Sequence, residues 1–278
     1  MRLIRNLVVP LLVAIAAAGA PAPSVAQVAA SLSITLAPPP LPVYAQPAIP
    51  APGYIWAPGY WAWGPAGYYW VPGTWVLPPA VGLLWTPGYW GWGGGLYRWH
   101  AGYWGPHVGF YGGINYGFGY TGVGYAGGYW QNGAFFYNRT VNNLGNARLA
   151  HVYTRAADNP AAVNRASFNG GTGGTAAHPT AQEQTAAREA HRRPTSPQVQ
   201  HARVASTNPA MRADTNHGQP AVAATQRPAV MPRPAAQPPR TANAPAAARP
   251  PAPARTAPAP AARTEQPRGE PRGDDEHH

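Results

Sequence analysis

The chain of 278 residues contains no cysteine and no lysine, so all 20 of its basic residues are arginine. The absence of cysteine excludes a zinc-thiolate site, a catalytic thiol, a disulfide framework and a bacterial lipoprotein anchor. Charged residues make up 10% of the chain, well below the ~25% typical of globular domains. All nine Asp and Glu residues follow position 157. The preceding segment therefore cannot carry out chemistry that needs a pair of carboxylates.

Glycine, proline and aromatic residues take the place of the missing types. The chain has 32 Gly and 36 Pro, together about a quarter of its length, which approaches the level of low-complexity sequence. It also has 11 Trp, 15 Tyr and 5 Phe, and 28 of these 31 aromatics fall between Tyr54 and Tyr137. This uneven distribution predicts several zones and not one uniform globule.

The first 26 residues are typical of a secretory signal peptide. Arg2 and Arg5 supply the positive end, residues 7–18 form an apolar stretch, and Ser24 and Ala26 are small residues suited to cleavage before Gln27. A membrane anchor fits less well, because about 20 uninterrupted apolar residues are needed to span a bilayer and four Pro or Gly residues interrupt this segment. We expect an exported protein in the periplasm, the outer envelope or the medium, with no transmembrane segment after signal cleavage.

Three zones follow in the expected mature chain. Residues 27–52 form a Pro-rich connector with one possible strand at 31–36, and residues 53–140 form an aromatic, Gly-rich module. Residues 141–278 are rich in Ala, Pro and Arg, with no aromatic residue after Phe168. Such a segment has little apolar surface to offset a chain entropy of ~1–2 kcal/mol per residue, so we predict a long disordered tail with, at most, a transient helix near 182–193.

The aromatic module contains an internal repeat. A W-x-x-G-x-W pattern occurs four times, and residues 53–75 match residues 82–104 at 12 of 23 positions. The residues of this signature, together with one further Trp in each half, are Trp56, Gly59, Trp61, Trp63, Trp70, Gly73, Trp75, Trp85, Gly88, Trp90, Trp92, Trp99, Gly102 and Trp104.

Each repeat favours short antiparallel hairpins. Aromatic residues alternate at period 2 between Gly and Pro residues, and Asn132-Gly133 is typical of a two-residue hairpin turn. Three of the four motifs contain Pro-Gly, which suits a type II turn that would place Trp56 opposite Trp61. The same pairs are also compatible with kinks inside longer strands. The sequence leaves this layout open, but both versions predict an all-β module.

The four W-x-x-G-x-W copies resemble the bacterial WXXGXW repeat family, also written YXWGXW. The fourth copy differs, with Ala101-Gly102 in place of Pro-Gly. The resemblance implies a small exported protein of a Gram-negative envelope, in a family with no established activity or catalytic residues.

We therefore expect a non-enzymatic structural or interaction protein of the envelope or cell surface. His100 and His107 could in principle bind a metal ion, but we expect them to be stacked on aromatic rings or exposed at the surface. No cofactor is expected. The 17 Arg and 9 acidic residues after position 138 leave two interpretations open. They form a solvated tail that keeps the protein soluble, or they bind anionic lipopolysaccharide or glycan, because Arg binds phosphate and carboxylate well. Self-association is compatible with the aromatic sheet, and nucleic acid is not expected.

The alternative is a module that binds polysaccharide or peptidoglycan on exposed Trp and Tyr rings. Trp61 with Trp63, and Trp90 with Trp92, would share a strand face and could form a platform. The signature rings form either this platform or the core, and their burial separates the two interpretations.

Overall fold

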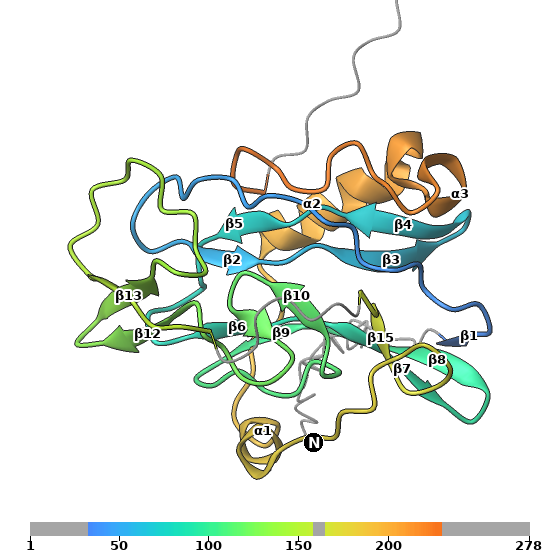
Figure 1. The fold of residues 1–278 in the computed structure, drawn as a ribbon, viewed down its shortest axis with the longest axis horizontal. Coiled ribbons are helices and arrows are strands. Elements are labelled where there is room, and N and C mark those ends of the chain that lie inside the picture. Colours follow the sequence, from blue (N-terminus) through green and yellow to red (C-terminus); the bar gives the residue numbers. More distant parts are fainter. Residues whose placement is uncertain (1–32, 158–164, 230–278) are drawn as a thin grey trace, which may run out of the picture. The chain divides into compact units, whose positions relative to one another are not determined.

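The computed structural model describes residues 33–157 and 165–229. The predicted signal peptide and residues 230–278 of the predicted tail lie outside this part. Within it are fifteen short strands, three α-helices and one 3-10 helix (Figure 1). The strands are β1 (Ser33–Ile34), β2 (Ile55–Ala57), β3 (Tyr60–Gly64), β4 (Gly67–Val71), β5 (Thr74–Val76), β6 (Leu84–Thr86), β7 (Tyr89–Gly93), β8 (Leu96–His100), β9 (Tyr103–Gly105), β10 (Asn115–Gly117), β11 (Tyr120–Thr121), β12 (Gly128–Gln131), β13 (Ala134–Asn138), β14 (Val152–Tyr153) and β15 (Phe168–Asn169). The helices are α1 (Ala181–Ala186), α2 (Ser196–Thr207), η1 (Pro209–Met211) and α3 (Ala213–Asn216).

The first repeat is one long hairpin with a kink in each arm. Strand β2 leads through Pro58-Gly59 into β3, and β4 leads through Pro72-Gly73 into β5. Strand β3 pairs with β4, and β2 pairs with β5. Trp61 consequently lies opposite Trp70, whereas Trp56 lies opposite Trp75. The Pro-Gly pairs are kinks within the arms, and the alternative placement of Trp56 opposite Trp61 is wrong.

The second repeat has the same construction. Strand β7 pairs with β8 and β6 pairs with β9, so that Trp90 faces Trp99 and Trp85 faces Trp104. The glycines of the four W-x-x-G-x-W motifs are Gly59, Gly73, Gly88 and Gly102. None of these four motif glycines has a positive φ, so the suggested type II turns do not form at the kinks. The short antiparallel hairpins confirm the all-β fold class.

The hairpin ends carry the left-handed turn residues. Gly94 and Gly95 connect β7 to β8 with φ of 61° and 81°, and Asn132-Gly133 connects β12 to β13 with φ of 50° and 77°. Two successive positive φ values are the hallmark of a type I′ turn, whose twist matches that of the flanking strands. The prediction of a hairpin at Asn132-Gly133 is thus confirmed.

The four motif glycines provide flat surfaces for tryptophan rings of the opposite arm. A Cβ atom on Gly73 would lie 2.5 Å from Cζ2 of Trp56, and the same atom on Gly59 would overlap the ring of Trp70. The second repeat repeats the arrangement, with 2.5 Å from Gly88 to Trp99 and 2.6 Å from Gly102 to Trp85. The first Trp of each motif therefore packs on the glycine of the facing motif. This contact explains why the motifs work in pairs.

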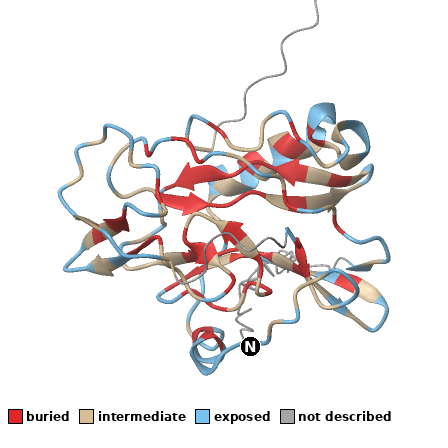
Figure 2. Cartoon of the chain, viewed as in Figure 1, coloured by how far each residue is buried: buried red, intermediate tan, exposed pale blue. Residues whose placement is uncertain are grey.

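The two hairpins stack face to face, as two layers that Figure 1 shows one above the other. Their interface is aromatic: Tyr60 stacks on Trp99 with ring centroids 5.2 Å apart, and Tyr68 meets Trp90 edge-on at 5.6 Å. The indole Nε1 of Trp90 donates a hydrogen bond of 2.8 Å to the carbonyl oxygen of Trp61. Buried residues are concentrated in these strands (Figure 2). The core is therefore built from indole and phenol rings where other proteins use aliphatic side chains.

The segment between the second repeat and β12 covers the core with irregular backbone. It contributes the small β10–β11 ladder and the buried side chains of Tyr111, Ile114, Tyr116 and Tyr120. The hydroxyl of Tyr120 donates to the carbonyl of Trp85 at 2.9 Å. Alternation of glycine with aromatic residues thus yields a cover whose tyrosines also satisfy the backbone of the repeat.

The described part of the predicted tail is folded against the repeats, which corrects the predicted boundary at 140. Strand β15 pairs with β7, and α2 packs on β4. Residues 223–225 pair with the kink at Gly73, whose N–H donates to the carbonyl of Ala223 at 3.0 Å. The prediction weighed only the apolar content of the tail itself. It missed the unpaired backbone and indole groups that the kinked hairpins present to it.

Replacing Gly73 by Ala tests the contact between glycine and indole. The added methyl group overlaps the Trp56 ring, so we expect the free energy of unfolding to fall by about 1–3 kcal/mol. Urea denaturation measures the loss. Gly93→Ala is the matched control, because its Cβ meets no atom within 4 Å, and it should stay within about 0.5 kcal/mol of the parent chain. Equal effects of the two substitutions would refute the role of the contact.

Candidate functional site

The signature tryptophans are mostly core residues. Seven of the ten are buried, namely Trp56, Trp61, Trp70, Trp75, Trp85, Trp90 and Trp104. Trp63 and Trp99 are half-buried, and Trp92 is 38% exposed. A buried ring has no face to offer a polysaccharide. A glycan platform on the predicted row is therefore reduced to Trp63 and Trp92, near the hairpin ends, and even Trp92 is partly covered by Gly170 and Gly171.

The buried indole N–H groups hold segments from both ends of the chain. In the first repeat, Trp61 donates to the carbonyl of Pro40 at 3.1 Å and Trp75 donates to that of Pro47 at 2.8 Å. These two bonds place the Pro-rich connector along the first hairpin. Sequence reasoning missed them, because backbone carbonyl acceptors leave no trace in the residue types.

Helix α2 is attached to the second repeat in the same way. The Oε1 atom of Gln198 accepts from the indole of Trp104 at 2.8 Å and from the amide of Thr195 at 2.9 Å. Thr195 precedes the helix as its N-cap, and Pro197 lies in the first turn, where a missing N–H costs nothing. One side-chain oxygen thus both starts the helix and fixes it to the repeat.

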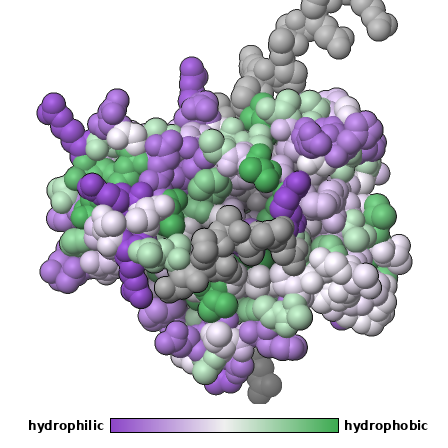
Figure 3. Space-filling model, in the orientation of Figure 1, coloured by the Kyte–Doolittle hydropathy of each residue, from purple (hydrophilic) through white to green (hydrophobic). Residues whose placement is uncertain are grey.

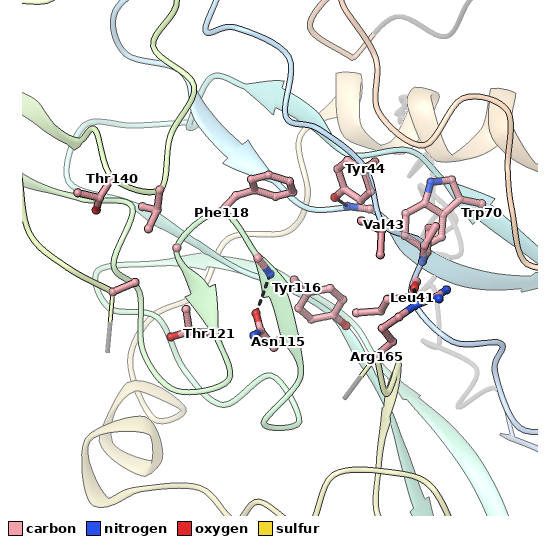
Figure 4. Close-up of a pocket in the computed structure, with 16 residues that line it drawn as sticks. Leu41, Val43, Tyr44, Trp70, Asn115, Tyr116, Phe118, Thr121, Thr140 and Arg165 are labelled. Atoms are coloured by element: carbon pink, nitrogen blue, oxygen red, sulfur yellow. Dashed lines mark hydrogen bonds between the residues drawn. The ribbon is translucent and has the colours of Figure 1, made fainter. Parts of the chain in front are cut away.

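A cavity lies where the connector, the first repeat and the cover segment meet (Figure 4). We call it the aromatic cavity; its volume is about 620 Å³. Four rings line it, those of Tyr44, Trp70, Tyr116 and Phe118. Figure 4 shows Arg165 and Leu41 at one end and Thr140 at the other, with Asn115 and Thr121 between them.

Phe118 is held in this cavity by a strained backbone. Its φ is 53°, a left-handed value that is rare for an aromatic residue, and it lies between Gly117 and Gly119, with φ of 76° and 94°. Its ring packs 5.2 Å from that of Tyr44 and 5.6 Å from that of Trp56. Residues in such conformations cost of order 1–3 kcal/mol and occur preferentially at functional sites. Phe118 is therefore a candidate functional residue.

The two phenols of the cavity are hydrogen-bonding groups and not bases. Burial raises the pKa of Tyr44 to about 12, and its hydroxyl accepts from the amide of Gly59 at 3.2 Å. Burial also raises the pKa of Tyr116 far above its ordinary value, and its hydroxyl donates to the carbonyl of Gly88 at 2.7 Å. Both stay protonated at neutral pH. The arrangement can therefore stack on a ligand and hydrogen-bond to it.

Arg165 supplies the positive charge of the cavity. Its Nε atom donates to the carbonyl oxygen of Leu41 at 2.7 Å, which fixes the guanidinium beside the connector. The residues described as lining the cavity include no carboxylate. The cavity therefore suits a ligand with flat apolar faces and a negative group.

The histidines of the aromatic module lie elsewhere. Nδ1 of His107 and Oε1 of Glu189 are 2.7 Å apart, the single ion pair recorded among residues 33–157 and 165–229. His100 stacks on Tyr89 with centroids 4.5 Å apart, and partial burial, then the charge of Arg98, lowers its pKa. No group of three potential metal ligands occurs in the described ranges. No helix of this part is long and apolar enough to span a bilayer.

The surface of the described chain is strongly positive. It carries eleven arginines against three carboxylates, those of Glu183, Glu189 and Asp214. Strongly hydrophilic side chains project at several separate places on the face shown in Figure 3. The exposed arginines are Arg98, Arg139, Arg148, Arg155, Arg165, Arg188, Arg192, Arg193, Arg203 and Arg227.

Comparison with known proteins identifies the repeats. A family model for the WXXGXW repeat matches the chain twice, at residues 52–76 and 81–104. The chain is thus a protein with two WXXGXW repeats, as its sequence resemblance indicated. Each matched copy corresponds to one kinked hairpin, and so to two W-x-x-G-x-W motifs. Neither a curated protein nor a solved structure matches the chain.

The contact between the two repeats can be tested at Trp90. Trp90→Phe removes the N–H that satisfies the carbonyl of Trp61, and an unpaired buried group costs about 1–3 kcal/mol of folding free energy. Thermal and urea unfolding measure this loss. Trp92→Phe, at the 38% exposed ring of the same strand, should cost less than about 1 kcal/mol. If Trp92→Phe were as destabilising as Trp90→Phe, the hydrogen bond would not hold the repeats together.

Proposed function

We propose that this chain is an exported, non-enzymatic structural and interaction protein of the bacterial envelope, whose arginines bind anionic envelope polymers. The observation that carries the proposal is the excess of exposed guanidinium groups over carboxylates on a rigid aromatic core. Arginine binds phosphate and carboxylate through two parallel hydrogen bonds, so such a surface suits lipopolysaccharide phosphates and acidic glycans.

The core supports a structural role. Seven signature tryptophans are buried in two stacked hairpins. The N–H groups of Trp61 and Trp75 hold the connector in place, and that of Trp104 holds α2. The residues that the family signature specifies are thus used for folding. Chemistry at neutral pH would need a base, and the phenols of the aromatic cavity are kept protonated by burial, which raises their pKa.

Export is supported by the sequence alone. Arg2, Arg5 and the apolar stretch at 7–18 have the order and length of a signal peptide, and Ala26 is a suitable residue before the cut. The alternative function, a polysaccharide-binding module, remains compatible with this location. The burial of most signature tryptophans weighs against glycan binding on these rings. Glycan binding is favoured only on aromatic rings that keep exposed surface.

The proposed export can be tested by locating the protein in the cell and sequencing its N-terminus. Expressed in a Gram-negative host, the protein should appear outside the cytoplasm with Gln27 as its first residue, as read by N-terminal sequencing. Ala26→Leu should leave the uncleaved precursor, because a large residue is excluded immediately before the cut. Ala30→Leu, four residues further on, is the control and should be processed normally. A full-length parent protein in the cytoplasm would contradict the proposal.

Binding to anionic polymers should depend on arginine and on salt. We expect the mature chain to bind vesicles of lipopolysaccharide, and to ignore neutral lipid vesicles, in a co-sedimentation assay. Replacing Arg192, Arg193 and Arg203 by Gln should weaken binding about tenfold, while replacement by Lys should retain most of the affinity, because the charge remains. Raising the salt from 0.05 M to 0.5 M should release the protein. Binding to neutral vesicles with equal affinity, or no effect of the Gln variant, would overturn the proposal.

A further inference from the structure

The aromatic cavity has the size and lining of a small-molecule site. Its volume of about 620 Å³ lies within the range of roughly 300–1,000 Å³ usual for ligand pockets. Its lining comes from separate parts of the chain: Tyr44 from the connector, Trp70 from β4, Phe118 from the cover segment and Arg165 from the segment before β15. The repeat signature does not predict this site, because only Gly59 and Trp70 among its lining residues belong to the signature.

The four rings of the cavity differ in how much surface they expose. Trp70 and Tyr116 are buried, and the rings of Tyr44 and Phe118 pack against each other with centroids 5.2 Å apart. Tyr44 and Phe118 are half-buried, so each keeps ring surface that a ligand can cover. Flat apolar ring faces beside polar edges suit partly hydrated ligands such as the C–H faces of a sugar ring. The left-handed backbone at Phe118 holds its ring beside Tyr44 at an energetic cost, and residues in such conformations occur preferentially at functional sites.

The polar groups point to a negatively charged sugar. The Arg165 guanidinium stands at one end of the cavity, and the amide of Asn115 lies between that end and Thr140 (Figure 4). A guanidinium prefers a carboxylate or phosphate. A free phosphate would leave Tyr44 and Phe118 without a partner, whereas a sugar ring that carries a carboxylate uses both kinds of group.

We propose that the aromatic cavity binds one acidic sugar unit of a polysaccharide, with its ring against the cavity-facing surface of the Tyr44–Phe118 pair and its carboxylate on Arg165. This inference deepens the proposed function and rests on it for the acidic polymer as the class of ligand. It moves glycan recognition from the tryptophan row to a site formed by the connector, the first repeat and the cover segment.

The test uses trigalacturonate as the acidic probe and maltotriose as the neutral one, titrated into the mature protein by calorimetry. Trigalacturonate should bind saturably at one site, and at least about tenfold more tightly than maltotriose, since only the acidic sugar can form a charge-assisted pair with Arg165. Arg165→Gln should remove this preference and leave maltotriose binding unchanged. Phe118→Gly should weaken both sugars about tenfold or more; glycine tolerates the positive φ, so the fold is retained.

Matched controls separate this site from the charged surface. Arg98→Gln and Tyr129→Ala remove an exposed arginine and an exposed ring outside the cavity, and neither should alter trigalacturonate binding. Thermal unfolding checks that each variant is folded, and Arg165→Gln keeps the test open if Phe118→Gly is not. Absence of saturable binding overturns the inference, as does equal affinity in parent, Arg165→Gln and Phe118→Gly proteins.

The same variants distinguish this inference from the proposed function. If the Arg192, Arg193 and Arg203 replacements weaken lipopolysaccharide binding while the cavity variants leave trigalacturonate binding intact, the cavity inference fails and the proposed function stands. If the cavity variants alone have effects, the cavity is the site and the surface arginines are not. If neither set has an effect, both proposals fail.

Discussion

The packing of an indole ring on a glycine of the facing arm is the contact on which the rest of this structure depends. Trp56 covers Gly73 and Trp70 covers Gly59, and the second repeat does the same with Trp85 and Trp99. No side chain fits between the ring and the backbone, so the glycine is obligatory. The contact also requires two motifs in antiparallel register, which makes the kinked hairpin, and not the single motif, the folding unit.

The same construction explains why the flanking segments fold onto the repeats. Large indole rings fill the core with few aliphatic residues, but each carries an N–H that needs an acceptor when buried. The kinks further leave backbone groups without a neighbouring strand, as at Gly73. The flanking segments supply such partners. Carbonyls of the connector at Pro40 and Pro47 accept from two indoles, the amide oxygen of Gln198 accepts from a third, and residues 223–225 pair with the kink at Gly73. Segments with little apolar surface of their own thereby become part of the fold.

The proposals assign folding and recognition to different aromatic residues. Most signature tryptophans are buried in the core, while Tyr44 and Phe118 stay half-buried where they border the aromatic cavity. Charge is divided in a similar way, because the core repeats are almost uncharged and the arginines lie on the surface and at one end of the cavity. The proposed surface for anionic polymers and the proposed pocket for one acidic sugar are compatible parts of one protein.

The sequence by itself determined the all-β class, the repeat family, the hairpin turn at Asn132-Gly133 and the separation of aromatic from charged zones, because these depend on residue type and local spacing. It did not determine whether Pro58-Gly59 is a turn or a kink, since either geometry accepts the same dipeptide. It also missed the fold of the described residues after 140 and the convergence of Tyr44, Phe118 and Arg165. Only the tertiary structure decided these, because they depend on hydrogen bonds and contacts between residues far apart in the chain, whose backbone acceptors carry no signature in the sequence.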